Sequence, residues 1–352
     1  MSDVLNAPKR ILIYGVGGVG LAIARLLNDR GWPVVAAVNR AGAKVGKDLG
    51  SLADAAGLAG IIVEDADAVN FSDIDADIAI IAINDRLKYN APHHKRLLEA
   101  GLNVICVGGE SSYPQAVDLE LSAALDRMAR ANGVTFTGCG LWDTYRVWSV
   151  KTLCGPCTLL RGLHHRSVTD ANRFGPEVVR LARIGDAPES FDQGQDSTSE
   201  PEKSIYRVFV HQVVASLGLT VTSVTERQEP VYFDEPVHCP VLERDIEPGF
   251  CVGTRSIIEV KTKENVTALA EVDLRLTQRG EGEWMSWSID GNPAAEMRLH
   301  GLDTGHATVS SVVNRIQDVV AAQPGLVTID QMAPMQFQPN PISITQKVAE
   351  LV

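Results

Sequence analysis

A glycine-rich turn between a predicted strand and a predicted helix constrains the fold of this chain most. The apolar run Ile11–Tyr14 leads into a G-x-G-x-x-G turn, and the helical pattern Leu21–Leu27 follows it. In this context the spacing predicts a dinucleotide-binding turn. The first glycine permits the tight turn, the second lets the backbone approach a pyrophosphate, and the third lets helix and strand pack closely. We therefore predict that the phosphates of a nicotinamide or flavin dinucleotide bind at this helix N-terminus, on Gly15, Val16, Gly17, Gly18, Val19 and Gly20.

Strands and helices alternate through the rest of the first 145 residues. Apolar runs predict strands at 33–38, 60–63, 77–82, 103–107 and 134–136, and helical patterns cover 89–100 and 113–132. The continuous apolar run at 77–82 is typical of a parallel strand that is covered on both faces. The alternation predicts an α/β domain of the Rossmann type, with a doubly wound parallel sheet.

The sequence pattern changes after residue 145. Residues 269–277 alternate between apolar and polar side chains, which is typical of a half-buried antiparallel strand. After a turn at 279–282, Met285, Trp287 and Ile289 give the returning strand one apolar face. We also expect strands at 160–168 and 256–260, a polar surface loop at 187–203, and a helix at 306–322 that stops at Pro324-Gly325.

These patterns predict three parts of the chain. Residues 1–145 form the dinucleotide-binding domain, and residues 146–302 form an α+β substrate and dimerisation domain with an open, largely antiparallel sheet. Residues 303–352 form a C-terminal helix and tail that return to the first domain. Because an open sheet with an apolar face needs a cover, we expect a homodimer.

Composition and charge exclude several classes of protein. The net charge of −12 argues against nucleic acid as a partner, because phosphate binding needs a basic surface. We find neither a membrane span of about 18 apolar residues nor a signal peptide at Met1–Val4. The six cysteines are read as reduced thiols of a cytoplasmic protein. Cys154-Gly155-Pro156-Cys157 lacks a second Cys-x-x-Cys, so we predict a structural loop and no metal.

The end of the second strand bears on the choice of cofactor. NAD sites usually place a carboxylate there, about twenty residues past the glycines, to bind the ribose 2′-hydroxyl. Here the strand ends in Val38-Asn39-Arg40, and Lys44 follows shortly. Arginine can pair with a 2′-phosphate, so Asn39 and Arg40 favour NADP. The alternative is that Arg40 is a solvated charge and that Asn39 serves NAD.

Further candidates lie at the carboxyl ends of the fourth and fifth strands, where open α/β sheets bind their ligands. We assign Ala82, Asn84 and Gly109 to the cofactor site, with Asn84 near the nicotinamide-side ribose or phosphates. Asn84 could also cap the helix that follows. Glu110 would be a carboxylate beside the hydride-transfer site, suited to acid–base chemistry. Its alternative is a helix N-terminal glutamate with Ser111 or Ser112 as the cap.

The sixth strand leads into another glycine-rich stretch. Gly138, Cys139 and Gly140 indicate close approach of the backbone to the cofactor, and Trp142 could wall an apolar substrate pocket. Packing at a domain junction is the alternative for Trp142. We assign Asn172 and Phe174 to the same pocket.

Together these positions resemble the dihydrodipicolinate reductase superfamily, and more closely the 2,4-diaminopentanoate dehydrogenase-like proteins and native amine dehydrogenases. The resemblance covers nearly the whole chain. It is most specific at residues 45–50, 108–110, 138–143, 305–308, 312–314 and 324–326. The parent reductases carry a His-His-x-x-Lys-x-Asp run whose lysine acts in reduction. Here His164 and His165 begin the run, but Val168 replaces the lysine, so that activity is not expected.

The amine dehydrogenase resemblance implies an NAD(P)H-dependent reductive amination of ketones or aldehydes with ammonia. It implies that Glu110 is the essential acid–base residue and that Asn314 lies near the nicotinamide. Two alternatives stay open. An enzyme acting on 2,4-diaminopentanoate would need an inward arginine, for which Arg166, Arg173 and Arg207 are available. A non-catalytic NADP-binding protein would bind the cofactor without turnover.

Overall fold

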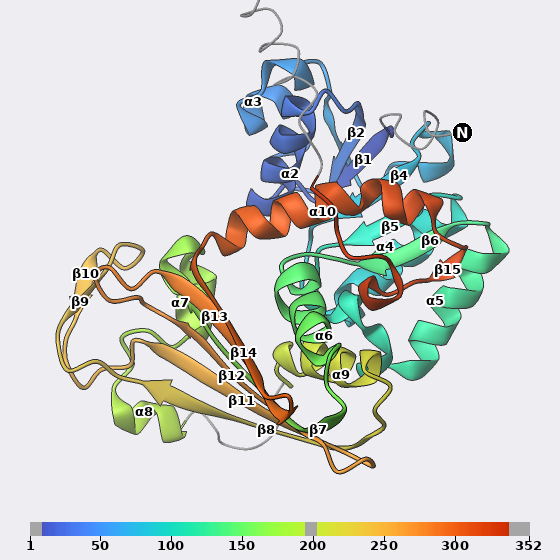
Figure 1. Ribbon diagram of the computed structural model, residues 1–352. Helices are drawn as coiled ribbons and strands as arrows, with labels where there is room; N and C mark the ends of the chain where they lie inside the picture. The colour runs from blue at the N-terminus through green and yellow to red at the C-terminus, as the bar shows by residue number, and fades with distance from the viewer. Residues whose placement is uncertain (1–8, 194–202, 338–352) are drawn as a thin grey trace, which may run out of the picture. The chain divides into compact units, whose positions relative to one another are not determined.

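The computed structural model describes residues 9–193 and 203–337, and the chain divides into two compact units (Figure 1). One unit comprises Met1–Tyr145 and His306–Val352, and the other comprises Arg146–Gly305. The C-terminal segment therefore packs with the N-terminal one. The three domain ranges given above, with boundaries after 145 and 302, stay predictions.

The first unit is built on a seven-stranded sheet in the order β15-β6-β5-β4-β1-β2-β3. All of its neighbouring strands pair in parallel, which confirms the predicted Rossmann-type fold. The order reverses between β1 and β4, so the switch point lies there. The strands are β1 (Ile11–Tyr14), β2 (Val34–Asn39), β3 (Val63–Asp65), β4 (Ile78–Ile81), β5 (Asn103–Cys106), β6 (Thr135–Gly138) and β15 (Gly325–Leu326).

Helices cover this sheet and bury its central strands completely. The side chains of β1 and β4 are fully buried, which explains their unbroken apolar runs. Leu97 and Leu98 of α4 and Leu125 of α5 belong to the same core. Figure 1 shows α10 running past α2. The helices are α2 (Gly18–Asp29), α3 (Leu49–Ala53), α4 (Leu87–Glu99), α5 (Leu119–Ala131) and α10 (Thr304–Ala321).

One local prediction for this unit was wrong. The long helix expected from residue 113 begins at Leu119, where the Asp118 carboxylate accepts the N–H of Leu121 at 2.9 Å. The residues before it form two short 3₁₀ turns, Gly109–Ser112 and Pro114–Ala116. Pro114 opens the second of them, where it loses no helical hydrogen bond. The predicted stop of the C-terminal helix before Pro324-Gly325 is confirmed, since α10 ends at Ala321. Gly325–Leu326 then pairs with β6 as the edge strand β15.

The second unit contains a six-stranded sheet in the order β14-β13-β7-β12-β11-β8. Most pairs are antiparallel, as predicted, but β12 runs parallel to β7. Its strands are β7 (Leu159–Asp170), β8 (Val221–Val231), β11 (Gly253–Thr262), β12 (Thr267–Arg275), β13 (Glu283–Asn292) and β14 (Ala295–Leu302), beside the small pair β9 (Val237–Cys239) and β10 (Arg244–Ile246). The helices are α6 (Ser149–Cys154), α7 (Pro176–Leu181), α8 (Pro188–Gln193) and α9 (Tyr206–Ser216).

The apolar face of this sheet is already covered within the chain. Phe209 of α9 packs on Trp287 of β13 and on His165 of β7, with ring centroids 6.4 and 5.2 Å apart. Asp273 and Arg275, predicted to lie on the polar side of β12, are also buried. The need for a cover therefore no longer argues for a dimer.

The predicted polar loop at 187–203 is helical in part, because α8 spans Pro188–Gln193. Residues 194–202 of that loop lie outside the described part of the chain. Across 9–193 and 203–337, no helix combines the length and the apolar character that crossing a membrane requires.

Candidate active site

The glycine turn has the geometry that a dinucleotide requires. Gly15 has a φ of +100°, and a Cβ there would lie 2.5 Å from the carbonyl oxygen of Ala82. A Cβ on Gly20 would lie 1.9 Å from the carbonyl oxygen of Gly15, so only glycine lets α2 pack this closely. Around Gly17 and Gly18 no atom lies within 4 Å of such a Cβ. Since no side chain caps α2, its first turn can bind an anion.

Asn39 supports the glycine turn from the end of β2. Its Oδ1 accepts the backbone N–H of Val16 at 3.2 Å, and Lys44 Nζ donates to the carbonyl oxygen of Val16 at 2.6 Å. Arg40, the next residue, is exposed. This end of β2 therefore combines two hydrogen bonds to the turn with an exposed positive charge.

Asn84 connects β4 to α4. Its side-chain oxygen accepts the N–H of Arg86 at 2.8 Å, and its carbonyl oxygen accepts from Asn90 Nδ2 at 2.6 Å. The N-cap residue of α4 is Arg86, so Asn84 does not cap the helix itself. Its side chain binds the N–H of that N-cap residue instead, which is close to the capping role considered as the alternative. The contact of Asn84 with a nicotinamide-side ribose or phosphate stays a prediction. The assignment of Ala82 to the cofactor site also stays a prediction.

Glu110 is buried, with 5% of its surface exposed, in the 3₁₀ turn that follows β5. Arg86 Nη1 donates to its Oε1 at 2.9 Å, and the backbone N–H of Leu87 donates to its Oε2 at 2.8 Å. Glu110 thus satisfies the N-terminus of α4, a helix that precedes it in sequence. Glu110 does lie in the first turn of a short 3₁₀ helix, but the N-cap of that helix is Gly108, so the cap predicted at Ser111 or Ser112 was wrong.

The glycines of this region let backbone segments approach one another. A Cβ on Gly138 would lie 2.2 Å from the carbonyl oxygen of Ser111, and one on Gly108 would lie 2.3 Å from the carbonyl oxygen of Asn84. The turn is also held by Asp85, whose Oδ1 accepts the N–H of Gly109 at 3.0 Å. Gly138 and Gly108 thus set the position of the Glu110 turn, and cofactor contacts at Gly109 and Gly138 stay predictions.

Trp142 lies against the Glu110 turn. A Cβ on Gly109 would be 2.8 Å from Cη2 of the Trp142 indole. The next residue, Asp143, forms a buried ion pair with Arg315 of α10, with Nε–Oδ2 and Nη2–Oδ1 distances of 2.6 and 2.9 Å. The Asp143 carboxylate raises the pKa of Arg315, which stays charged. This pair ties the segment of Trp142 to α10.

The remaining predicted cofactor residues have partners within the first unit. Cys139 is buried, and burial raises the pKa of its thiol, so any cofactor contact there would use its backbone. Gly140 faces Thr308, whose Cγ2 would lie 3.4 Å from an added Cβ. Asn314 Oδ1 accepts from Arg30 Nη1 at 2.6 Å. Arg30 is the C-cap of α2, the end away from the glycine turn, so a place beside the nicotinamide stays a prediction.

The predicted pocket residues of the second unit, Asn172 and Phe174, follow directly after β7. The N–H of Asn172 donates to Oδ1 of Asp170 at 3.0 Å, and Phe174 is 40% exposed. Arg173 between them pairs with Glu283 and Asp303 at 3.1 and 2.6 Å. A substrate pocket that joins Asn172 and Phe174 to Trp142 stays a prediction.

His164 and His165 point to opposite faces of β7, as predicted from strand geometry. His165 is fully buried against Trp287, and burial lowers the pKa of its ring well below the usual range. His164 lies on the other face, with Nε2 3.1 Å from Oε2 of Glu271.

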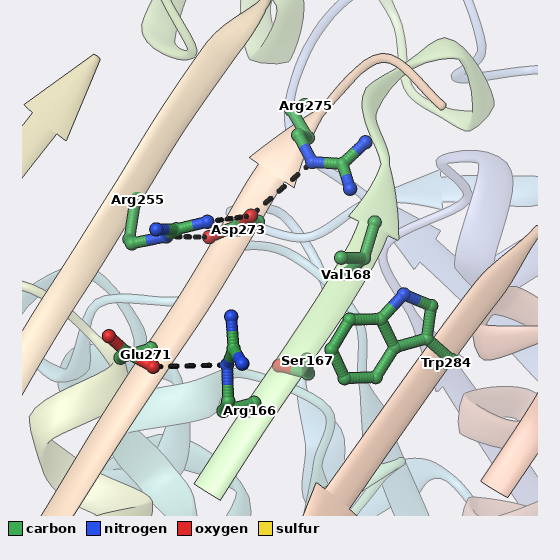
Figure 2. A pocket seen from close by; sticks show the side chains of 8 residues that line it. All are labelled: Arg166, Ser167, Val168, Arg255, Glu271, Asp273, Arg275 and Trp284. Carbon is green, nitrogen blue, oxygen red and sulfur yellow. Dashed lines mark hydrogen bonds and ion pairs between the residues drawn. The ribbon is translucent and has the colours of Figure 1, made fainter. Parts of the chain in front are cut away.

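A cavity of about 100 Å³ opens on this other face (Figure 2). Its three arginines are already paired: Arg166 with Glu271, Arg255 with Asp273 through two hydrogen bonds of 2.7 and 2.9 Å, and Arg275 with Asp273 and Glu281. Its lining includes Arg166, considered above as a carboxylate anchor, but none of the residues assigned to the catalytic, substrate-pocket or cofactor site. The lining side chains are Arg166, Ser167, Val168, Arg255, Glu271, Asp273, Arg275 and Trp284.

The Cys-Gly-Pro-Cys motif forms a turn at the end of α6, and both thiols are free. The N–H of Cys157 donates to the carbonyl oxygen of Cys154 at 2.9 Å. Burial, with the neighbouring Cys157, raises the pKa of Cys154 to about 11, so its reactive thiolate is scarce at neutral pH. Among residues 9–193 and 203–337, no group of three or more His, Cys, Asp or Glu side chains is arranged to hold a metal.

Sequence reasoning missed two residues of the first unit. Arg86 pairs with Glu110 across 24 positions, and Arg315 pairs with Asp143 across 172. The signal for Arg86 was its position directly after Asn84-Asp85, at the same sheet edge as Glu110. Nothing local in the sequence of α10 singles out Arg315.

The parallel sheet, its switch point and the glycine turn define a Rossmann-type dehydrogenase fold. A family model described as the 2,4-diaminopentanoate dehydrogenase C-terminal domain matches residues 148–348. The chain therefore belongs to the 2,4-diaminopentanoate dehydrogenase family.

Individual relatives agree with this assignment. The 2,4-diaminopentanoate dehydrogenase of Acetoanaerobium sticklandii is 25% identical over 336 residues, covering 91% of this chain and 92% of its own. The solved amine dehydrogenase from Mycobacterium smegmatis is 31% identical, with a TM-score of 0.86 over 95% of this chain and 99% of its own. The myo-inositol 2-dehydrogenase of Lactobacillus plantarum, 15% identical with a TM-score of 0.57 over 92% and 93%, shares the fold alone.

Proposed function

We propose that the protein is an amine dehydrogenase that aminates ketones or aldehydes with ammonia and, in reverse, oxidatively deaminates amines. The observation that carries this proposal is the buried Glu110 carboxylate at the carboxyl end of β5, held by Arg86 and the N-terminus of α4. This is the edge at which open α/β sheets bind their ligands. The similarity to amine and diaminopentanoate dehydrogenases supports the same chemistry.

The proposed reaction needs one group that moves protons and stabilises a cation. Ammonia adds to the carbonyl carbon, water leaves, and the resulting iminium carbon accepts a hydride. Glu110 relays the protons and stabilises the iminium charge, an effect that is larger at a buried site than in water. When bound, the reduced nicotinamide supplies the hydride. Trp142, Asn172 and Phe174 are proposed to line the substrate pocket.

The cofactor is proposed to be NADP(H), with NAD(H) as a second possibility. The open space around Gly17 and Gly18 and the uncapped first turn of α2 fit a dinucleotide pyrophosphate. Arg40 at the exposed end of β2 suits a 2′-phosphate, and Asn39 already binds the glycine turn through its side-chain oxygen.

A 2,4-diaminopentanoate dehydrogenase activity is the second candidate, favoured by the family model and the curated relative. Such an enzyme must recognise a carboxylate. Of the arginines considered for this role, Arg166 pairs with Glu271, and Arg173 pairs with Glu283 and Asp303. These acidic partners make both residues poor carboxylate anchors, which leaves Arg207 of α9 as the remaining candidate for this role.

The experiment that tests the proposal is NADPH oxidation with a panel of small ketones and aldehydes, with and without ammonia. The amine dehydrogenase proposal predicts ammonia-dependent turnover of ketones that carry no carboxylate. Turnover confined to 2-amino-4-oxopentanoate would favour the second candidate. Tight NADPH binding without any turnover would indicate a non-catalytic NADP-binding protein.

We also keep the homodimer and the cytoplasmic location as proposals. The homodimer no longer rests on an uncovered apolar face, since α9 packs on that face. Light scattering coupled to size-exclusion chromatography tests it directly, because a dimer has twice the 37.9 kDa mass of one chain.

A further inference from the structure

Glu110 is held at both of its carboxylate oxygens. Arg86 Nη1 lies 2.9 Å from Oε1, and the backbone N–H of Leu87 lies 2.8 Å from Oε2. The Leu87 contact adds the positive end of the α4 dipole. Two donors use two of the roughly four acceptor positions of a carboxylate, so further donors can still bind.

The groups around this carboxylate differ in charge. Asp85 has the same charge as Glu110, and its carbonyl oxygen accepts the N–H of Glu110 at 2.9 Å. His94 reaches Ser111 with its Nε2 at 3.2 Å, and burial lowers the pKa of its ring to about 3, so it is neutral. Cys106, on β5, is neutral because burial raises the pKa of its thiol to about 12.

Arg86 is therefore the positively charged side chain that pairs with the buried Glu110 carboxylate, next to the negative charge of Asp85. Its side chain is 19% exposed and that of Glu110 is 7% exposed, so solvent screens the pair only partly. Of the two donors that hold the carboxylate, Arg86 is the one that carries a full positive charge.

We propose that Arg86 is the positioning residue that keeps Glu110 ionised, so that the site takes up the reacting nitrogen as ammonium. This inference rests on the proposed function. Glu110 accepts a proton from ammonium, which releases ammonia to form the carbinolamine with the carbonyl group. Glu110 then returns that proton to the carbinolamine hydroxyl, which leaves as water. The carbonyl compound and ammonium thus become an iminium ion and water, and Glu110 ends as a carboxylate again.

The first test is the pH profile of reductive amination in Arg86→Met and Arg86→Lys. Arg86→Met is expected to lower kcat/KM for ammonium at least tenfold at neutral pH and to move its acid limb up by about one pH unit or more. KM for the ketone is expected to change less than threefold. Arg86→Lys keeps the charge and is expected to keep the acid limb in place. Arg161→Met, which removes an exposed ion pair with Asp290, is the matched control.

The second test needs no catalysis. Protein labelled with ¹³C at the glutamate side-chain carboxyl gives a Glu110 signal that is assigned by its loss in Glu110→Gln. At about pH 6, the signal of the wild-type protein is expected at the carboxylate position. In Arg86→Met it is expected to move toward the protonated acid, and Arg86→Lys is expected to resemble the wild type.

The outcomes separate this inference from the proposed function. An unchanged carboxyl signal and acid limb in Arg86→Met would overturn the role of Arg86, even if amination is observed. Equal loss of activity at every pH, with an unchanged signal, would indicate a merely structural residue and would also overturn it. A shifted signal in a protein without amination activity would support Arg86 and contradict the proposed function.

Discussion

The Trp142 indole lies directly against Gly109, so that a Cβ on Gly109 would be 2.8 Å from Cη2 of the indole. Gly109 precedes Glu110, so this contact links the proposed wall of the substrate pocket to the proposed acid–base residue. The buried Asp143–Arg315 pair holds the segment that carries Trp142. The orientation of Glu110 and the position of the indole are therefore coupled.

Gly109→Ala should reveal this coupling. Overpacking of this kind typically costs about 1–3 kcal/mol of folding free energy. Because it also displaces the Glu110 turn, we expect kcat/KM for the carbonyl substrate to fall about tenfold or more. Trp142→Ala removes the obstructing ring, so the double variant should lose much less than the sum of the single losses. Additive losses would show that the two residues act independently. Gly305→Ala, where the nearest atom is 3.6 Å from an added Cβ, is the control.

The parallel sheet could be predicted because its central strands β1 and β4 are unbroken apolar runs and the glycine turn fixes its first crossover. The start of α5 could not, because the helical pattern continues through two 3₁₀ turns and only the Asp118 cap decides the boundary. The parallel pairing of β12 with β7 depends on contacts more than a hundred residues apart, which a local alternation cannot reveal.

For the candidate site, residue types at strand ends pointed to Glu110, Asn39 and Asn84, but not to their partners. The alternative reading placed Glu110 at the N-terminus of the helix that follows it, whereas its carboxylate binds the N-terminus of α4. Burial of Asp273 and Arg275 was also not predictable, since it depends on the pairing of Asp273 with Arg255 and of Arg275 with Glu281.

Gly17→Ala and Gly20→Ala should separate cofactor binding from folding. An added Cβ on Gly17 meets no atom within 4 Å, so the variant should keep its melting temperature but bind NADPH at least tenfold more weakly, since that space would receive the pyrophosphate. On Gly20 it would lie 1.9 Å from a carbonyl oxygen, so that variant should also unfold at a lower temperature. NADPH titration and thermal unfolding of both proteins measure the difference. Unchanged NADPH affinity in Gly17→Ala would contradict the proposed site.

Arg40→Ala should change cofactor preference. A charge-assisted contact to a 2′-phosphate is worth about 1.5–3 kcal/mol, so kcat/KM for NADPH should fall about 10- to 150-fold. The value for NADH should change less than threefold. Lys95→Ala, which removes an exposed charge on α4, controls for net charge. Equal losses with the two cofactors would contradict a role for Arg40 in 2′-phosphate recognition.

His94 should make the folded state less stable as the pH falls. Burial lowers the pKa of its ring to about 3, so the folded protein leaves it neutral while the unfolded chain takes up a proton below about 6.5. Between these values the free energy of unfolding should drop by up to about 1.4 kcal/mol per pH unit from this residue. Urea unfolding at several pH values from 7 to 4 measures this change. The free energy of unfolding should fall less steeply with decreasing pH in His94→Gln than in the wild type, with exposed His300→Gln as the control. Identical slopes would count against a buried neutral His94.

Glu110 is the residue on which the proposed chemistry depends. Glu110→Gln keeps an oxygen that can accept the N–H of Leu87, so the fold of the turn should survive. General acid–base catalysis typically contributes about 10²–10⁴-fold, and the variant should lose this amount.

The most direct measurement is ammonia-dependent NADPH oxidation with a simple ketone, compared between the wild type and Glu110→Gln, with NADPH affinity measured on both. We predict turnover in the wild type, a loss of at least a hundredfold in the variant, and NADPH dissociation constants within about threefold of each other. Full amination activity in Glu110→Gln would contradict the account.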